Sequence, residues 1–573
     1  MKSEKAPVEM AIERDVGIKM DDGLVLRADI YRPKSGGKVP AIMNMGPYCK
    51  GLRYQEGYAD SWEFMTKTHP EILEGSTCSY LTWETVDPER WVPAGYAVVR
   101  IDSRGAGRSP GYMDFYSDRE IRDFYDCIEW AAVQPWCTGK IGLLGISYYA
   151  ITQWLVAAKQ PPHLTAILPW EGACDHYRDK TFHGGIFCNG FLERWYPMRA
   201  LPRQHGIGNN GPTDPWLGEP CSGPETLSKE ELAKNRRDYI VDTSKHKLID
   251  DFHKERIADL SKVVVPLMSA GNWGGIGLHN RGNFEGYLRS ASKQKWLSVH
   301  VGKHEEYFYL PYGLDIQRRF FDHFLKGIDN GFDKEPPVQL TIRHPDNKFE
   351  ERKENEWPIA RTIWTKMYLD TSSKRLARDP PSTKSNTSFR AGQDEIVFRA
   401  QPFEKETEIT GPIAAKIFMS STTSDADLYF TLRGFAPDGK EVTFQGANEP
   451  KAPLSQGWIR ASHRKLDPKL TLPYRPFHAH DEIQALTPGK VYALDVEIWP
   501  TCIVLPKGYW IELLVEGSDF ERPGAQGPFK GSGPFAHTYP SDHAPGMYDG
   551  VTSLYSGGDT DSYLLMPIVP PKI

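Results

Sequence analysis

Short, almost entirely apolar runs recur along the first 170 residues and constrain the fold more than any other feature of the chain. Four of them are Val39–Met45, Tyr96–Ile101, Ile141–Leu144 and Thr165–Trp170. Runs of this length without polar alternation are typical of strands buried on both faces. Between the second and third runs, apolar residues recur at helical spacing: Ile121, Tyr125, Ile128 and Ala132. The alternation predicts a mostly parallel sheet with helices on its faces.

The pattern begins with a hairpin and is later interrupted. Asp21-Asp22-Gly23 separates Val16–Met20 from Leu24–Tyr31 and predicts a tight turn between two strands. From 172 to 260 the chain is rich in Gly, Pro and aromatic residues, and Ser228 and Glu231 then form a capping box that opens a helical stretch. An insertion of this kind inside an α/β domain commonly covers the active site, so a helical cap is predicted at 172–260.

The α/β pattern resumes after the insertion and ends before residue 336. The resuming segments are Val263–Ala270, Trp296–Val301 and a helix near Leu314–Lys326 that Gly327 closes. Beyond Pro336, short alternating runs are separated by Gly and Pro turns: Ala414–Met419, Leu428–Arg433, Val491–Ile498 and Trp510–Val515. These runs predict a separate all-β domain, a sandwich or jelly roll. The expected division is an α/β domain at 1–171 and 261–335, a cap at 172–260 and a β domain at 336–573.

The overall composition limits the partners and the compartment. A net charge of −6 on 573 residues favours neither nucleic acid nor an anionic membrane as a partner. The first fifteen residues lack the apolar core of a secretory signal, and no run approaches 18 apolar residues. The eight cysteines form no C-x-x-C pair, so neither a zinc nor a redox motif is predicted. We expect a cytoplasmic protein with reduced, mostly buried thiols, and the oligomeric state, including a homo-oligomer, stays open.

The strongest chemical motif is Gly145-Ile146-Ser147-Tyr148-Tyr149. It follows the strand Ile141–Leu144 directly and leads into the helical stretch Ala150–Lys159. A strand, a Gly-x-Ser turn and a helix in this order form a nucleophile elbow, which lifts the serine above the sheet edge. The usual final glycine of G-x-S-x-G is Tyr149 here. The motif predicts Ser147 as the nucleophile of an α/β-hydrolase, with the Tyr148 amide as one oxyanion donor.

Further motifs surround the elbow: Asp102-Ser-Arg-Gly-Ala-Gly-Arg-Ser-Pro-Gly111, Asp126-x-x-Glu-Trp130, Gln134-Pro-Trp136 and Gly139-Lys-Ile-Gly142, leading into Gly145-Ile-Ser-Tyr148. Together they resemble the motifs of the cocaine esterase / X-Pro dipeptidyl-peptidase family of α/β-hydrolases, a group that includes the α-amino acid ester hydrolases. The resemblance continues in Ile409–Pro412, Asp425–Leu428 and Leu494–Pro500. It implies an α/β-hydrolase domain followed by a jelly roll. It also implies a second oxyanion donor, a tyrosine hydroxyl after an early strand, and Tyr48 matches that position; Tyr48 as a packing residue is the alternative.

The base is predicted from chain order. In this fold the catalytic histidine follows the last sheet strand. Trp296–Val301 is that strand, and His304 comes three residues later. His279 and His300 are the alternatives. No dinucleotide cofactor is predicted, because Gly105-x-Gly107 has Pro110 where the third glycine of the phosphate-binding loop would stand. No other cofactor and no metal is implied.

The acid is where the sequence departs from the family. The resemblance implies an Asp shortly after the strand Val263–Ala270, but Gly274 occupies that position. Some hydrolases instead carry the acid at the end of the strand that follows the nucleophile helix, and Glu171 ends that strand here. A triad is defined by geometry rather than by sequence position, so Glu171 is the predicted acid. Asp175, Asn272 or an incomplete triad are the alternatives. A purely structural role for Glu171 would be an ion pair with Arg178 or Arg194.

The predicted function is serine hydrolysis of an ester or amide in a small organic substrate through an acyl-enzyme. Five aromatic residues are candidates for an apolar pocket: Trp62, Trp83, Phe187, Trp195 and Tyr196. One rival is an X-Pro or amino-acyl peptidase, for which Glu193, Asp175 and Asp179 would bind an ammonium group. A second is acyl transfer or cyclisation without hydrolysis. A third is a binding protein with an inert α/β domain.

Overall fold

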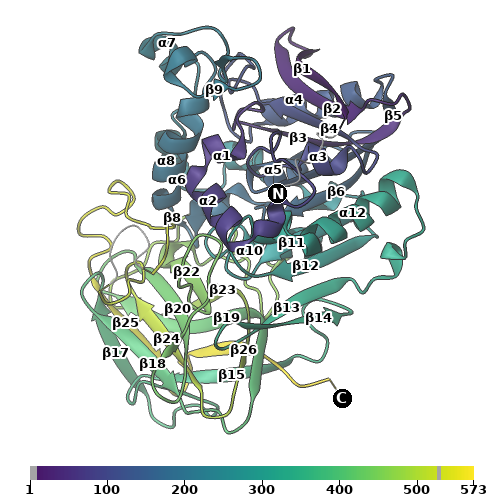
Figure 1. Cartoon of the computed structure of the whole chain (residues 1–573). Helices are drawn as coiled ribbons and strands as arrows, with labels where there is room; N and C mark the ends of the chain where they lie inside the picture. The colour runs from purple at the N-terminus through teal and green to yellow at the C-terminus, as the bar shows by residue number, and fades with distance from the viewer. Residues whose placement is uncertain (1–8, 525–530, 573) are drawn as a thin grey trace.

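A computed structural model describes residues 9–524 and 531–572 and divides them between two large sheets (Figure 1). The first sheet has the strand order β1-β2-β4-β3-β5-β6-β11-β12-β13-β14. Its strands are β1 (Met10–Lys19), β2 (Val25–Pro33), β3 (Val39–Gly46), β4 (Ala97–Asp102), β5 (Cys137–Ile146), β6 (Leu164–Trp170), β11 (Leu267–Asn272), β12 (Lys295–His300), β13 (Val338–His344) and β14 (Lys348–Glu354). Every pairing from β4 to β13 is parallel, while β1, β2 and β14 pair antiparallel. The predicted mostly parallel sheet and its opening hairpin are confirmed.

Helices cover both faces of this sheet because successive residues of each buried strand point to opposite sides. Met43, Val99 and Leu143 pack in one apolar cluster with α4 (Asp118–Ala132) and α5 (Tyr148–Ala157). The neighbouring residues Ile42, Val98 and Leu144 pack in another cluster with α12 (Pro311–Lys326). The remaining helices of this domain are α1 (Tyr54–Gly57), α2 (Ala59–Thr68), α3 (Pro88–Trp91), α10 (Asn280–Arg289) and α11 (Glu306–Tyr309). This arrangement is the α/β-hydrolase fold that the sequence predicts.

The insertion between β6 and β11 forms the predicted helical cap. It contains α6 (Asn189–Trp195), α7 (Lys229–Lys234), α8 (Tyr239–Lys245) and α9 (Asp251–Lys254), with the short hairpins β7 (Phe182–His183), β8 (Ile186–Phe187), β9 (Thr213–Asp214) and β10 (Glu219–Pro220). The capping box of Ser228 and Glu231 opens α7 as expected. In Figure 1 the cap runs down from α7 to β8, which lies next to the second domain. There the Gly184 carbonyl accepts a hydrogen bond from the Arg460 amide.

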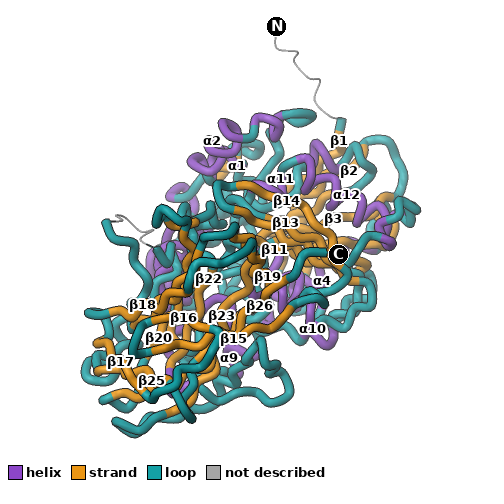
Figure 2. Tube along the Cα trace, turned by 90° about the horizontal axis from the view of Figure 1, so that it is seen from below, coloured by secondary structure: helices purple, strands orange, loops and turns teal. Residues whose placement is uncertain are grey.

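The second domain is all-β, as predicted, and its sheet closes on itself. Its strands are β15 (Ile363–Asp370), β16 (Arg375–Ala377), β17 (Ser385–Arg390), β18 (Glu395–Ala400), β19 (Thr407–Ser421), β20 (Asp427–Phe435), β21 (Glu441–Val442), β22 (Ser455–Arg460), β23 (Tyr492–Leu505), β24 (Trp510–Glu516), β25 (Val551–Ser556) and β26 (Tyr563–Val569). The order runs β19-β23-β22-β20-β24-β18-β16-β15-β26, and β26 pairs with β19 again. Figure 2 shows these strands at one end of the molecule and α1, α2 and α12 at the other.

Two sequence expectations differ from the structure in their bounds. The strand expected from Val263 begins only at Leu267, directly after Pro266, whose ring leaves no N–H for a sheet ladder. The expected domain boundary at 335/336 precedes β13 and β14, which extend the first sheet to Glu354. We therefore propose that the α/β domain ends between Glu354 and Ile363. Within the described residues, no helix is long and apolar enough to cross a membrane.

Candidate active site

Ser147 stands in the strained turn that the elbow motif predicts. It has φ 57° and ψ −111°, lies between β5 and α5, and its amide donates to the carbonyls of Trp170 and Glu171. A non-glycine residue in this left-handed region is strained, and such strain is typical of this elbow. Tyr149 fits where the motif usually has glycine because its ring covers Gly46, where a Cβ would lie 2.6 Å from the ring.

Glu171 contacts the histidine that the sequence selected. Its Oε2 lies 2.6 Å from Nδ1 of His304, and its Oε1 lies 2.8 Å from Nε2 of His300. Burial alone would raise the pKa of this carboxyl, but the charge of His304 and hydrogen bonds from both histidines outweigh it and lower the pKa to about 2. Glu171 is therefore an ionised carboxylate positioned to orient an imidazole. Arg178, one of its expected alternative partners, is bonded to Asp175 instead.

The histidine in contact with Ser147 is His279 rather than His304. The Ser147 Oγ lies 3.2 Å from Nε2 of His279. The His279 and His304 rings are stacked, with their centroids 4.9 Å apart and their planes 8° from parallel. Burial, and then the neighbouring charge of His304, lower the pKa of His279 well below its usual value. His279 was only an alternative in the sequence analysis, and its position before α10 carries no motif that would have selected it.

The second nitrogen of His304 is occupied by Glu84, which the sequence analysis missed. His304 Nε2 lies 3.1 Å from Oε1 of Glu84. Burial disfavours the imidazolium, but Glu171 and Glu84 together raise the pKa of His304 well above its usual value. Burial raises the pKa of Glu84 itself, against the effect of His304. The Glu84 carbonyl also accepts from the Ile146 amide, so this loop is fixed to the elbow beside Ser147.

Both predicted oxyanion donors are close to the nucleophile. Tyr148 is the first residue of α5, where the backbone N–H has no acceptor within the helix. The Tyr48 hydroxyl accepts a hydrogen bond of 2.9 Å from Nε1 of Trp195, and an accepting hydroxyl still has its own proton to donate. Burial raises the pKa of Tyr48 well above its usual value, so this hydroxyl stays protonated. Ser147 and Tyr48 line the same cavity.

The remaining acid candidates have other partners. Asp175 caps the turn that follows it by accepting from the amides of Tyr177 and Arg178, and it pairs with the Arg178 guanidinium. Asn272 donates from Nδ2 to Oε1 of Glu171, at 3.1 Å, and to the carbonyl of Gly302. Asn272 therefore holds Glu171 in place and does not replace it. Gly274 occupies the position where the family resemblance implies an Asp.

A cavity of about 410 Å³ opens above Ser147 between the two domains and the cap. Its floor carries Ser147, His279, His304, Glu84 and Tyr48. Its apolar wall includes Tyr58, Trp83, Phe191, Trp195, Met198 and Leu278, and the second domain contributes Gln445, Ala447, Asn448, Pro450 and Pro534. Among the described lining residues, Trp83 and Trp195 are the expected aromatics that reach the cavity, whereas Trp62, Phe187 and Tyr196 pack elsewhere. The volume suits a small organic molecule.

Family models cover both domains of the chain. The model for the X-Pro dipeptidyl-peptidase S15 family matches residues 22–306, and the model for the X-Pro dipeptidyl-peptidase C-terminal non-catalytic domain matches residues 330–564. A putative serine esterase of Mycobacterium bovis is 25% identical, with 88% of this chain and 90% of the relative covered. The cocaine esterase of a Rhodococcus strain is 22% identical, with 98% and 99% covered.

A solved structure agrees with this assignment over almost the whole chain. A CocE/NonD family hydrolase from Staphylococcus aureus is 32% identical, with 98% of this chain and 94% of that chain covered and a TM-score of 0.84. The family resemblance seen in the motifs is thereby confirmed. The match to the S15 peptidase family model agrees with this structural similarity. The chain is a serine hydrolase that belongs to the CocE/NonD family of α/β-hydrolases.

Proposed function

We propose that this enzyme hydrolyses esters whose acyl group is bulky and apolar or aromatic, with Ser147 as the nucleophile. The observation that carries the proposal is the cavity above Ser147, whose wall is largely aromatic and aliphatic. The Ser147 oxygen attacks the ester carbonyl, and its proton passes to an imidazole. The Tyr48 hydroxyl and the Tyr148 amide stabilise the oxyanion. The alcohol leaves with the imidazole proton. The imidazole then takes a proton from water, which attacks the acyl-enzyme, and Ser147 recovers that proton as the acid is released.

In this proposal His304 is the base, although His279 contacts Ser147 in the resting site. A serine triad needs a carboxylate at Nδ1 of the base, because the carboxylate fixes the tautomer and stabilises the imidazolium. His304 has Glu171 at that nitrogen, whereas Nδ1 of His279 is buried without a hydrogen-bond partner in the described part of the chain. For this role Oγ of Ser147 must reach Nε2 of His304, the nitrogen that Glu84 contacts in this structure.

Two of the carboxylates that were candidates for binding a substrate ammonium already have ionic partners. Of the carboxylates considered for an ammonium, Asp175 pairs with Arg178 and Asp179 pairs with Arg281. Three cationic residues line the cavity instead: Arg194, Arg199 and Lys303. Asp60, Glu84 and Glu305 line it as well, so a substrate ammonium would meet like charges as well as carboxylates. The ester proposal therefore rests on the apolar wall of the cavity and not on the charges of its lining.

The test compares kcat/KM for p-nitrophenyl esters of short aliphatic, long aliphatic and aromatic acids with that for X-Pro p-nitroanilides. We expect the bulky and aromatic esters to be the better substrates. A higher kcat/KM on the dipeptide anilides would refute the ester proposal. Ser147→Ala should abolish turnover and labelling by a fluorophosphonate.

The assignment of the base is tested by a matched pair of variants. His304→Ala should lower kcat by several orders of magnitude, and His279→Ala by much less. The opposite ranking would make His279 the base while leaving the substrate proposal intact.

A further inference from the structure

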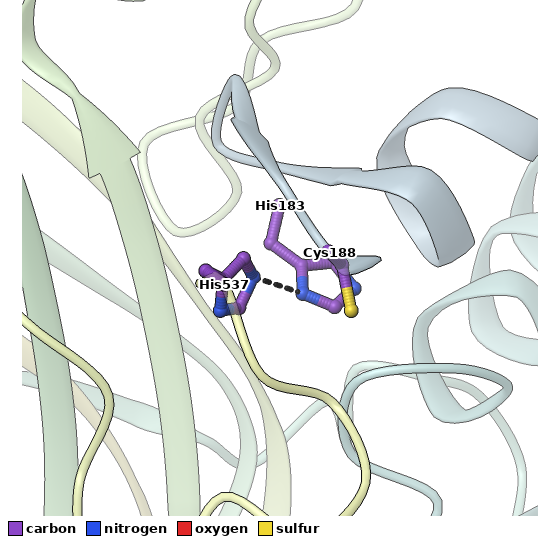
Figure 3. A group of neighbouring side chains, drawn as sticks. All are labelled: His183, Cys188 and His537. Carbon is purple, nitrogen blue, oxygen red and sulfur yellow. Dashed lines mark hydrogen bonds between the residues drawn. The ribbon is translucent and has the colours of Figure 1, made fainter. Parts of the chain in front are cut away.

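Three potential metal ligands meet where the cap packs against the second domain: His183, Cys188 and His537. Each offers one donor atom, and these three atoms all lie within 4.8 Å of one another. His183 ends β7 and Cys188 directly follows β8, so both come from one hairpin of the cap. His537 lies on a loop of the second domain, and Figure 3 shows one of its ring nitrogens bonded to a ring nitrogen of His183. All three side chains are buried.

The hydrogen bonds of His537 aim an unprotonated nitrogen at this cluster. Its Nδ1 lies 2.8 Å from Oδ1 of Asp519, and its amide donates to Oδ2 of the same carboxylate. Because a carboxylate only accepts, the Nδ1 proton is fixed there and Nε2 carries the lone pair. Nε2 lies 2.9 Å from Nδ1 of His183. A carboxylate that holds the outer nitrogen of a histidine is the usual support of a metal-ligating imidazole.

Backbone groups lie near the other two donors: the carbonyls of Asp179 and Gly277 beside the His183 ring, and the Phe191 amide beside the Cys188 thiol. Nε2 of His183 is buried without a hydrogen-bond partner among the described residues. The His183 ring packs 4.6 Å from Trp458 and edge-on to Trp499. Cys188 belongs to an apolar cluster with Leu278 and Phe535. Two imidazoles and a thiol gathered at one buried point are the ligand types that zinc takes in proteins.

We propose that His183, Cys188 and His537 bind a zinc ion that links the cap to the second domain. Two imidazoles and a thiolate are a donor set that zinc prefers, and water would complete a tetrahedron. Tetrahedral zinc at about 2.0–2.1 Å from each nitrogen requires nitrogens roughly 3.3 Å apart. The observed separation is 2.9 Å, so the two ring nitrogens must move apart by a few tenths of an ångström, and the rings must turn until both lone pairs converge on the ion.

Zinc binding would change the protonation of two of its ligands, His183 and Cys188. Without metal, Nδ1 of His183 donates to His537. On binding, zinc takes the place of that proton, which moves to Nε2 of His183, where the carbonyls of Asp179 and Gly277 lie near the ring. The Cys188 thiol becomes a thiolate, so one proton is released for each zinc bound.

Such an ion would also hold one side of the substrate cavity. Cys188 immediately precedes α6, and the Gly190 amide of that helix donates to the Ala536 carbonyl beside His537. Trp195, at the end of α6, donates to the Tyr48 hydroxyl. Fixing Cys188 to His537 therefore restrains the helix that positions a proposed oxyanion donor. The site is structural in this proposal, since no ligand of the ion lines the cavity floor.

The experiment uses the full-length enzyme and needs no substrate. The protein is freed of metal with a chelator, titrated with Co²⁺ and Zn²⁺, and followed by absorption spectroscopy, metal analysis and thermal unfolding. We expect one tightly held equivalent of zinc, a rise in Tm on its addition, and a thiolate-to-cobalt charge-transfer band in the Co²⁺ form.

The variants assign this signal to the proposed ligands. Cys188→Ala should abolish the thiolate band and weaken zinc binding at least about tenfold. Cys127→Ala, which removes a buried thiol of α4, should change neither the thiolate band nor zinc binding. His279→Ala should keep the zinc, which separates this site from the other donor group at Glu171, His279 and His304. If Cys188→Ala does not fold, zinc binding by His537→Gln and the Co²⁺ spectrum of the wild type still test the proposed ligands. A folded wild-type protein that shows no thiolate band and no rise in Tm would overturn the proposal.

Discussion

Replacing Glu84 by Gln tests how the site controls the proton of His304. The substitution keeps the size of the side chain and removes the charge that lies 3.1 Å from Nε2 of His304. Glu84 and Glu171 both raise the pKa of His304, so the imidazole is held in its protonated form. A protonated histidine cannot act as a base. We therefore expect Glu84→Gln to make His304 a competent base at lower pH.

The size of the effect follows from the geometry. An opposite charge within hydrogen-bonding distance of a buried group shifts its pKa by about 1–3 units, which corresponds to roughly 1.4–4 kcal/mol. Loss of the Glu84 charge should lower the pKa of His304, since Glu171 alone would then support the imidazolium. The acid limb of the kcat/KM profile reports the base in the free enzyme. It should move to lower pH by about one unit or more.

The assay is kcat/KM for one ester between pH 4 and 10 in wild type and Glu84→Gln. Glu305→Gln is the matched control, because Glu305 also lines the cavity but accepts from the Ser61 hydroxyl rather than from an imidazole. Its acid limb should move much less. An acid limb that stays in place in Glu84→Gln, or moves to higher pH, would refute the assignment of Glu84 as the carboxylate that holds the His304 proton.

Four further outcomes follow from the site. Glu171→Gln should lower kcat by about 10⁴-fold while KM changes little, as an acid-to-amide change does in a serine triad; a kcat within tenfold of wild type would exclude Glu171 as the acid. Tyr48→Phe should lower kcat by about 10²-fold, since one oxyanion donor is lost, and an unchanged kcat would show that the hydroxyl does not reach the oxyanion. The pKa of Glu171 is lowered from 4.5 to about 2, and this contributes about 3 kcal/mol to the free energy of unfolding. The contribution is complete above pH 4.5 and is lost as the pH falls toward 2. Acid unfolding monitored by circular dichroism should show this loss in wild type and less of it in Glu171→Gln. Glu171→Gln combined with Gly274→Asp should stay inactive and unfold at lower temperature than Glu171→Gln alone, whereas recovered turnover would mean that an acid fits at 274.

Most of the scaffold was predictable because its signals are local. The buried strands β3 to β6 appear in the sequence as continuous apolar runs, and α4 appears as a helical repeat. The turn of Ser147 needs only its own strand and helix. The His304 position follows from chain order alone.

The parts of the site that the sequence did not reveal depend on contacts between distant segments. Glu84 comes from a loop without a motif and reaches His304, 220 residues away. His279 reaches Ser147 across 132 residues. The same limit hid the proposed zinc ligands, since Cys188 and His537 show none of the close spacing by which zinc motifs are recognised. No local pattern reports such distances, and only the packed tertiary structure brings the groups together.

The position of the acid illustrates how the second domain shapes the catalytic centre. A Cβ on Gly274 would lie 2.4 Å from the Cα of Gly446, so no side chain fits at the position where the family resemblance implies an Asp. The Ala447 amide donates to the Gly274 carbonyl, and the Ala447 carbonyl accepts from the His304 amide. The second domain therefore packs against the loop that would carry the acid and against the predicted base. A carboxylate can reach Nδ1 of His304 from the neighbouring strand instead, and Glu171 at the end of β6 does so at 2.6 Å. Close docking of the second domain thus excludes a side chain at 274, and Glu171, the residue that follows β6, is the carboxylate in contact with Nδ1 of His304.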